Sequence, residues 1–126
     1  SHIIAPAIHK TRREVAGYFQ QSQIVLTDLM NTCGEDGENP WKSQLDRNRI
    51  RSLLKKNRYF SKNLDDSRLL TSKPLLNKIE WLLYELLMTD DKASCQKLQE
   101  LQDYIKQERL LFKIRLVGKE LKTTDI

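Results

Sequence analysis

The sequence PLLNKIEWLLYELLM, residues 74–88, decides the fold. Its apolar side chains recur at helical spacing and form one broad stripe, consisting of Leu75, Leu76, Ile79, Leu82, Leu83, Leu86 and Leu87. Trp81 and Met88 flank this stripe. An apolar face of this width has to be buried by several neighbouring elements, and each buried Leu or Ile contributes about 1.5–3 kcal/mol. We therefore predict that residues 73–88 form the central helix of a bundle.

Capping patterns indicate where the helices begin. Ser72 fits the N-cap position of the central helix and Pro74 its first turn, where the missing N–H costs nothing. Thr11 and Glu14 form the capping-box pattern T-x-x-E, which predicts a helix start at Thr11. The Asn-Pro pair at 39–40 predicts a second helix start.

Near the end of the chain, periodicity alone does not distinguish a helix from a strand. Residues 112–116, FKIRL, alternate as a strand does, but the sequence offers no second strand to pair with them. We therefore extend one helix through this segment, with its cap at Thr89 or Asp90, and expect Gly118 to bend or end it.

The predicted fold class is all-α, an antiparallel four-helix bundle. Its helices are expected near residues 11–32, 40–64, 73–88 and 90–121. A single domain then covers residues 11–121, between an irregular lead-in at 1–10 and a frayed tail at 122–126. The length of 126 residues fits one domain.

Chemically reactive patterns are scarce. The acidic segment at 34–40, GEDGENP, offers hard oxygens, but its spacing differs from that of a calcium loop, so we interpret it as a solvated loop. His2 and His9 lie away from any carboxylate cluster. We predict no catalytic residue, no metal and no cofactor, and hence a protein that is not an enzyme.

The two cysteines, Cys33 and Cys95, form no CxxC motif and have no nearby histidine pair, so a zinc site is not indicated. The preferred interpretation is two unpaired thiols near helix ends. The alternative is one disulfide bond, if the protein is exported.

The second predicted helix has the most polarised surface of the sequence. Residues 42–62 contain eight basic residues and one acidic residue, within a chain of net charge +5. Five of these cations follow one helical stripe, namely Arg47, Arg51, Lys55, Arg58 and Lys62, which we call the basic stripe. It could bind nucleic-acid phosphates, an acidic protein or anionic lipid. The preferred interpretation is a solvated face that pairs with acids on neighbouring helices.

Four segments of the sequence form a distinctive series, namely YFQQSQIVLTDLMN (18–31), LLKKNRYFSKNL (53–64), PLLNKIEWLLYELL (74–87) and IKQERLLFKIRLVGKEL (105–121). In this order they resemble a family of extracytoplasmic helical domains from bacterial anti-sigma-factor-like proteins. In that family the domain follows a single membrane span, and some members have an N-terminal zinc finger. Both the zinc motif and the span are outside this sequence, since no apolar run approaches the roughly 18–20 residues that a span needs.

The resemblance implies a non-enzymatic sensing or interaction domain that lies outside the cytoplasm, is anchored by a membrane span before Ser1, and signals through its first helix. It singles out the polar residues Asn57, Arg58, Glu80, Lys113 and Arg115. We expect a structural Arg58–Glu80 contact inside the bundle. The expected partner is a protein, with a homo-oligomer as a further option. The alternative function is a cytoplasmic nucleic-acid-binding domain that uses the basic stripe.

Overall fold

Every element that the computed structural model describes is a helix, within residues 6–32, 44–63, 67–89 and 95–122. The helices are α1 (Pro6–Met30), α2 (Gln44–Lys62), α3 (Ser67–Leu70), α4 (Lys73–Met88), α5 (Cys95–Gln107) and α6 (Leu110–Lys122). The prediction of an all-α fold is confirmed for this part of the chain. The segment that alternates like a strand belongs to α6 and is helical.

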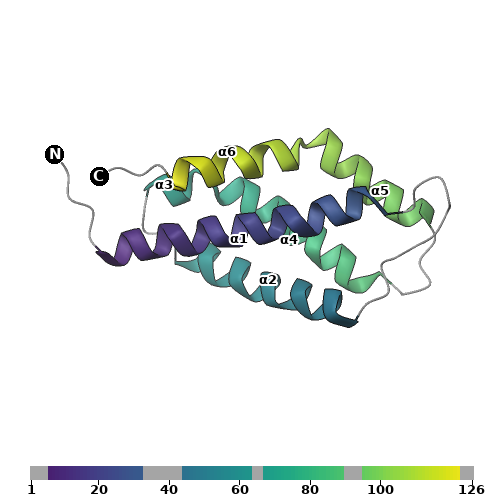
Figure 1. Cartoon of the computed structure of the whole chain (residues 1–126), viewed down its shortest axis with the longest axis horizontal. Coiled ribbons are helices and arrows are strands. Elements are labelled where there is room, and N and C mark those ends of the chain that lie inside the picture. Colours follow the sequence, from purple (N-terminus) through teal and green to yellow (C-terminus); the bar gives the residue numbers. More distant parts are fainter. Residues whose placement is uncertain (1–5, 33–43, 64–66, 90–94, 123–126) are drawn as a thin grey trace.

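The long helices alternate in direction along the chain (Figure 1). From left to right in that view, α1 runs forward, α2 returns, α4 runs forward again, and α5 and α6 return together. The most extensive contacts join α1 to α6 and α2 to α4, and further contacts join α1 to α2 and α4 to α6. The start of α1 and the end of α6 therefore lie at the same end of the molecule.

The apolar stripe of α4 forms the centre of the core, as predicted. Its buried residues are Leu75, Leu76, Ile79, Leu82, Leu83 and Leu86. The same cluster receives side chains from α1, α2, α3, α5 and α6. Trp81 and Met88, which flank the stripe, are exposed by 45% and 64%. One face of α4 thus contacts the core and the opposite face contacts solvent.

Two predicted N-caps are wrong, namely Thr11 for the first helix and Thr89, one of the two candidates for the last helix. Helix α1 begins at Pro6, not at Thr11, so Thr11 and Glu14 lie within the helix and form no N-cap. Pro6 at the first helical position needs no N–H partner, and the next residues contain no helix breaker. Thr89 is the C-cap of α4 and does not cap the last helix. The Asn-Pro start at 39–40, the acidic segment at 34–40 and Asp90 lie outside the described residues.

Ser72 occupies the predicted N-cap position of α4, but its hydroxyl makes a different bond. The Oγ atom donates to the carbonyl of Leu69 at 2.6 Å and makes no capping bond to α4. Helix α3 ends close to Ser72, and its last carbonyls need donors. The serine side chain therefore stabilises the end of α3.

The expected fourth helix is broken into α5 and α6, and the break is not at Gly118. The chain turns at Glu108 and Arg109, where Arg109 has a φ of 52°. Its N–H bonds to the carbonyl of Lys106, while the N–H of Lys113 already bonds to the carbonyl of Arg109. A left-handed residue ends one helix and the next begins directly. Gly118 lies within α6.

Polar side chains from neighbouring helices satisfy two helix C-termini. Gln102 of α5 donates through Nε2 to the carbonyls of Leu29 at 2.8 Å and Thr32 at 2.9 Å, at the end of α1. Arg47 of α2 donates through Nη2 to the carbonyl of Thr89 at 3.0 Å, at the end of α4. These bonds add side-chain donors to carbonyls in the last turn of α1 and just beyond the ends of α1 and α4, where backbone donors become scarce.

Truncation of Leu83 to alanine should destabilise the protein by about 2–5 kcal/mol, because it removes a fully buried side chain and leaves a cavity. The matched truncation Met88→Ala, on the exposed face of the same helix, should cost less than about 1 kcal/mol. Urea unfolding measures both values. Equal losses would contradict the assigned orientation of α4.

Replacement of Arg109 by glycine should leave the free energy of unfolding unchanged or raise it by up to about 1 kcal/mol, because glycine adopts the left-handed conformation without steric cost. The control Arg115→Gly, at an exposed position inside α6, should lower it by about 1 kcal/mol. Thermal or urea unfolding compares the two variants. A larger loss at Arg109 than at Arg115 would contradict the turn.

Candidate functional site

Helix α2 presents two chemically different faces. Its buried face carries Ile50, Leu53, Leu54, Asn57 and Phe60, at the spacing of one helical stripe. Asn57 is the polar member of this set, and it is completely buried. From Arg47 to Lys62 the helix contains seven basic residues and no acidic residue, and six of these seven side chains are exposed. Asn57, which the resemblance singles out, therefore lies on the core side of α2, whereas the exposed residues of the basic stripe lie on another side of the same helix.

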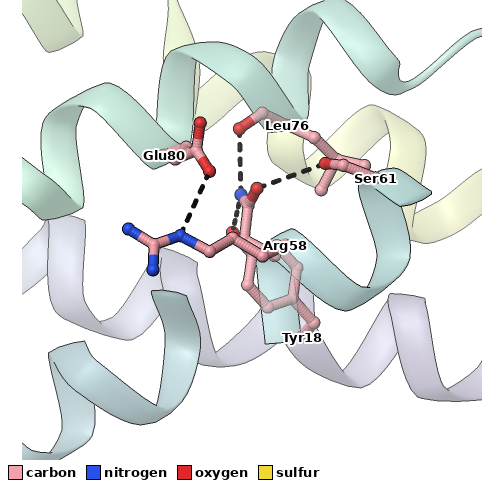
Figure 2. Close-up of polar contacts among 6 residues, drawn as sticks. Tyr18, Arg58, Ser61, Leu76 and Glu80 are labelled. Atoms are coloured by element: carbon pink, nitrogen blue, oxygen red, sulfur yellow. Dashed lines mark hydrogen bonds and ion pairs between the residues drawn. The ribbon is translucent and has the colours of Figure 1, made fainter. Parts of the chain in front are cut away.

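The carboxamide of Asn57 joins three helices, and Figure 2 labels its partners Tyr18, Ser61 and Leu76. Its Nδ2 atom donates to the hydroxyl oxygen of Tyr18 on α1 at 2.5 Å and to the carbonyl of Leu76 on α4 at 2.9 Å. Its Oδ1 atom accepts a hydrogen bond from Ser61 at 3.4 Å. Both donor positions of the amide are used, so the buried group is satisfied. Removal of such a buried partner leaves the others unpaired, at a cost of about 1–3 kcal/mol.

Burial raises the pKa of Tyr18 to about 12 from its ordinary value of 10.0. Loss of solvation disfavours the phenolate, and the charge of Glu80 acts in the same direction. The hydrogen bond with Asn57 opposes this change in part. The ring of Tyr18 also packs edge-on against Phe19 and Phe60, with centroid distances of 5.4 and 5.8 Å. Tyr18 is therefore a neutral core residue at neutral pH.

The predicted Arg58–Glu80 pair is present, but not inside the bundle. The Nε atom of Arg58 lies 3.8 Å from Oε2 of Glu80, and the two side chains are exposed by 60% and 40%. Figure 2 shows the pair beside Tyr18 and Leu76, the two residues to which Asn57 donates. Burial would remove both charges from water, which costs more than a single contact returns. The expectation of a buried pair is wrong, and an exposed pair contributes at most about 1 kcal/mol.

The basic stripe divides between two environments. Arg47 bonds to the end of α4 and Arg58 pairs with Glu80, so both point toward α4. Arg51 donates to the side chain of Asn48 at 3.3 Å on the same helix. Lys55 and Lys62 are exposed. Part of the stripe therefore holds α2 against α4, and the remainder is a cationic surface.

The resemblance also singles out Lys113 and Arg115 of α6. Lys113 lies beside Lys78 of α4, whose ammonium group lowers the pKa of Lys113. Lys78 in turn lies 3.0 Å from Glu108, and this hydrogen bond raises the pKa of Lys78. These residues link α4 to the turn between α5 and α6. Arg115 is exposed on α6.

Cys95, at the start of α5, is disulfide-bonded. The preferred interpretation of an unpaired thiol at this position is therefore wrong. The sequence has one other cysteine, Cys33, which lies outside the described residues. The sequence pattern left the disulfide as an alternative because cysteine spacing along a chain does not report distance in space.

Sequence reasoning missed the position of Asn57 in the core, although a signal was available. A helical template placed on Ile50 puts Leu53, Leu54 and Asn57 on the same face, at positions i+3, i+4 and i+7. It also missed that Tyr84 joins Trp81 and Met88 on the exposed face of α4. The ring centroid of Trp81 lies 4.5 Å from the ring centroid of Tyr104 on α5.

Within the part of the chain that the structure describes, no three His, Cys, Asp or Glu side chains gather as a metal would require. None of the helices described is both long and apolar enough to cross a membrane. No family model, curated protein or solved structure matches the chain.

The stability of the protein should fall as the pH rises above about 10, with a contribution from Tyr18. Because the pKa of Tyr18 is raised in the folded state, the unfolded state loses its proton first, and the stabilisation present below the unfolded value is lost between pH 10.0 and about 12. Between about pH 9 and about pH 11, the free energy of unfolding measured with urea should fall by about 1 kcal/mol more in the wild type than in Tyr18→Phe. If the free energies of unfolding of the wild type and of Tyr18→Phe changed equally with pH, the burial of the Tyr18 hydroxyl would be contradicted.

Proposed function

We propose that this domain is a non-enzymatic, extracytoplasmic sensing or interaction domain of an anti-sigma-factor-like envelope protein. The observation that carries the proposal is the disulfide bond of Cys95. Disulfide bonds persist in oxidising compartments and are rare in the cytosol. The resemblance of four segments, in order, to such domains points to the same compartment.

The proposed architecture is an antiparallel four-helix bundle in which α5 and α6 form one kinked arm. The directions of the helices in Figure 1 and the contacts among α1, α2, α4 and α6 support this assignment. In this arrangement α1 contacts α2, α5 and α6. A packing change in any of these helices reaches α1, and we propose that α1 transmits it to a membrane segment upstream of Ser1.

The proposed mode of action is contact with a protein partner, and a homo-oligomer is the second option. Exposed apolar side chains support a role in protein contacts, because aromatic residues and methionine are enriched at interfaces. On α4 these are Trp81, Tyr84 and Met88, at the spacing of one helical stripe. On α6 they are Phe112 and Leu116.

The compartment can be tested on the natural full-length gene product, tagged at its C-terminus in its own host. Protease added to spheroplasts should remove the tag, while a cytoplasmic marker stays intact. Thiol titration of the unfolded domain should find no free thiol before reduction and two afterwards, one for each cysteine. A tag that is protected until lysis, together with free thiols, would contradict the proposal.

The second candidate function is nucleic-acid binding by α2, because Arg51, Lys55 and Lys62 add exposed positive charge to a helix without an acid from residue 47 to 62. Fluorescence anisotropy with duplex and single-stranded DNA and RNA tests it. The leading proposal predicts no binding at about 150 mM salt. Micromolar binding with a steep salt dependence would favour the second candidate.

A matched pair of variants locates any binding that is seen. The triple variant Arg51→Gln/Lys55→Gln/Arg58→Gln should abolish binding if the basic stripe is responsible. The control Lys10→Gln/Lys73→Gln/Lys106→Gln removes the same charge from exposed positions on α1, α4 and α5. This control should retain most of the nucleic-acid binding. Equal losses in both variants would indicate a non-specific charge effect.

A further inference from the structure

A groove of about 460 Å³ lies between α1 and α2. Its volume is within the range of small-molecule sites, about 300–1,000 Å³. Gly17 of α1 lines it, and a Cβ atom built on Gly17 would meet no atom within 4 Å. The absence of a side chain at position 17 therefore helps to keep the groove open.

Three aromatic residues are among those that line the groove. Tyr18 and Phe60 are almost fully buried, and Tyr59 is exposed by 61%. The ring of Phe60 packs edge-on against both tyrosines, with centroid distances of 5.8 Å to each. The Asn57 bond to Tyr18 further fixes the position of that ring. This part of the groove is preformed, so a ligand would not have to order it.

The charged residues of the groove favour an anion. Lys55 and Lys56 line it, and both are exposed; its one acidic residue is Glu14. The structure gives neither lysine an ion pair with a described residue. The surrounding part of α2 adds further positive charge and no negative charge from residue 47 to 62.

We propose that the groove between α1 and α2 binds a small amphipathic anion, with a flat apolar body and one carboxylate or sulfonate group. The apolar body would contact Tyr59 and Phe60, and the anionic group would lie near Lys55 and Lys56. This inference goes beyond the proposed function and holds in either compartment.

A matched pair of fluorescent probes tests the ligand class. The anionic probe is 8-anilinonaphthalene-1-sulfonate, and the neutral probe is N-phenyl-1-naphthylamine, which lacks the sulfonate. The wild-type protein should bind the anionic probe saturably, with a Kd below about 100 μM, and bind the neutral probe several-fold more weakly. Absence of saturable binding, or equal binding of the two probes, would overturn the proposal.

Two glycines provide the control for position. Gly17→Leu should fill the groove and raise the Kd for the anionic probe by about tenfold or more. Gly118→Leu is the matched control, since Gly118 is also helical, has open space at its Cβ, and lines a separate groove of about 350 Å³ between α1 and α6. The Gly118→Leu variant should bind the anionic probe with a Kd within about twofold of the wild-type value. Equal effects in both variants, or no effect at Gly17, would overturn the proposal.

The lysines test the charge and decide the outcome if the leucine variant does not fold. Lys55→Gln/Lys56→Gln should weaken the anionic probe by about five- to tenfold and change binding of the neutral probe little. The control Arg51→Gln/Lys62→Gln removes the same charge from α2 outside the groove and should have an effect of at most about twofold. Circular dichroism and urea midpoints verify folding of each variant. Equal weakening by the two double variants would overturn the proposal.

Discussion

One buried carboxamide constrains how α1, α2 and α4 pack against one another. Asn57 lies on the core face of α2 and bonds to Tyr18 of α1 and to the backbone of α4. Leucine-rich faces can pack in several rotations with similar energies, because apolar contact has little directional preference. A buried amide is satisfied only where its partners are placed correctly, so it penalises the other rotations. The apolar stripe of α4 supplies the stabilisation, and Asn57 helps to select the packing.

Much of the fold could be predicted from the sequence, because burial follows helical periodicity. The stripe of residues 74–88 predicted both the bounds and the buried face of α4. The start of α1 and the break at Arg109 could not be predicted in the same way. Residues 6–10 lack a strong signal for or against a helix, and Arg109 adopts a left-handed conformation that residue type alone does not indicate. Gly118, a better candidate by residue type, lies within α6.

The candidate sites were predictable only as sets of residues. Periodicity placed the basic stripe on one side of α2, but neither the capping bond of Arg47 nor the disulfide bond of Cys95 follows from spacing along the chain. Both depend on residues that are distant in sequence. The groove between α1 and α2 is a further example, since Gly17 and Lys55 become neighbours only when the two helices pack. These features could therefore be identified only from the tertiary structure.

The most direct measurement of this arrangement is a ¹⁵N-edited NOESY spectrum of the folded domain near neutral pH. If Asn57 joins the three helices, its side-chain amide protons should exchange slowly with water and show cross-peaks to the ring protons of Tyr18 and to backbone protons near Leu76. Rapidly exchanging Asn57 protons without these cross-peaks would mean that the carboxamide contacts solvent. That result would contradict the packing of α1, α2 and α4 described above.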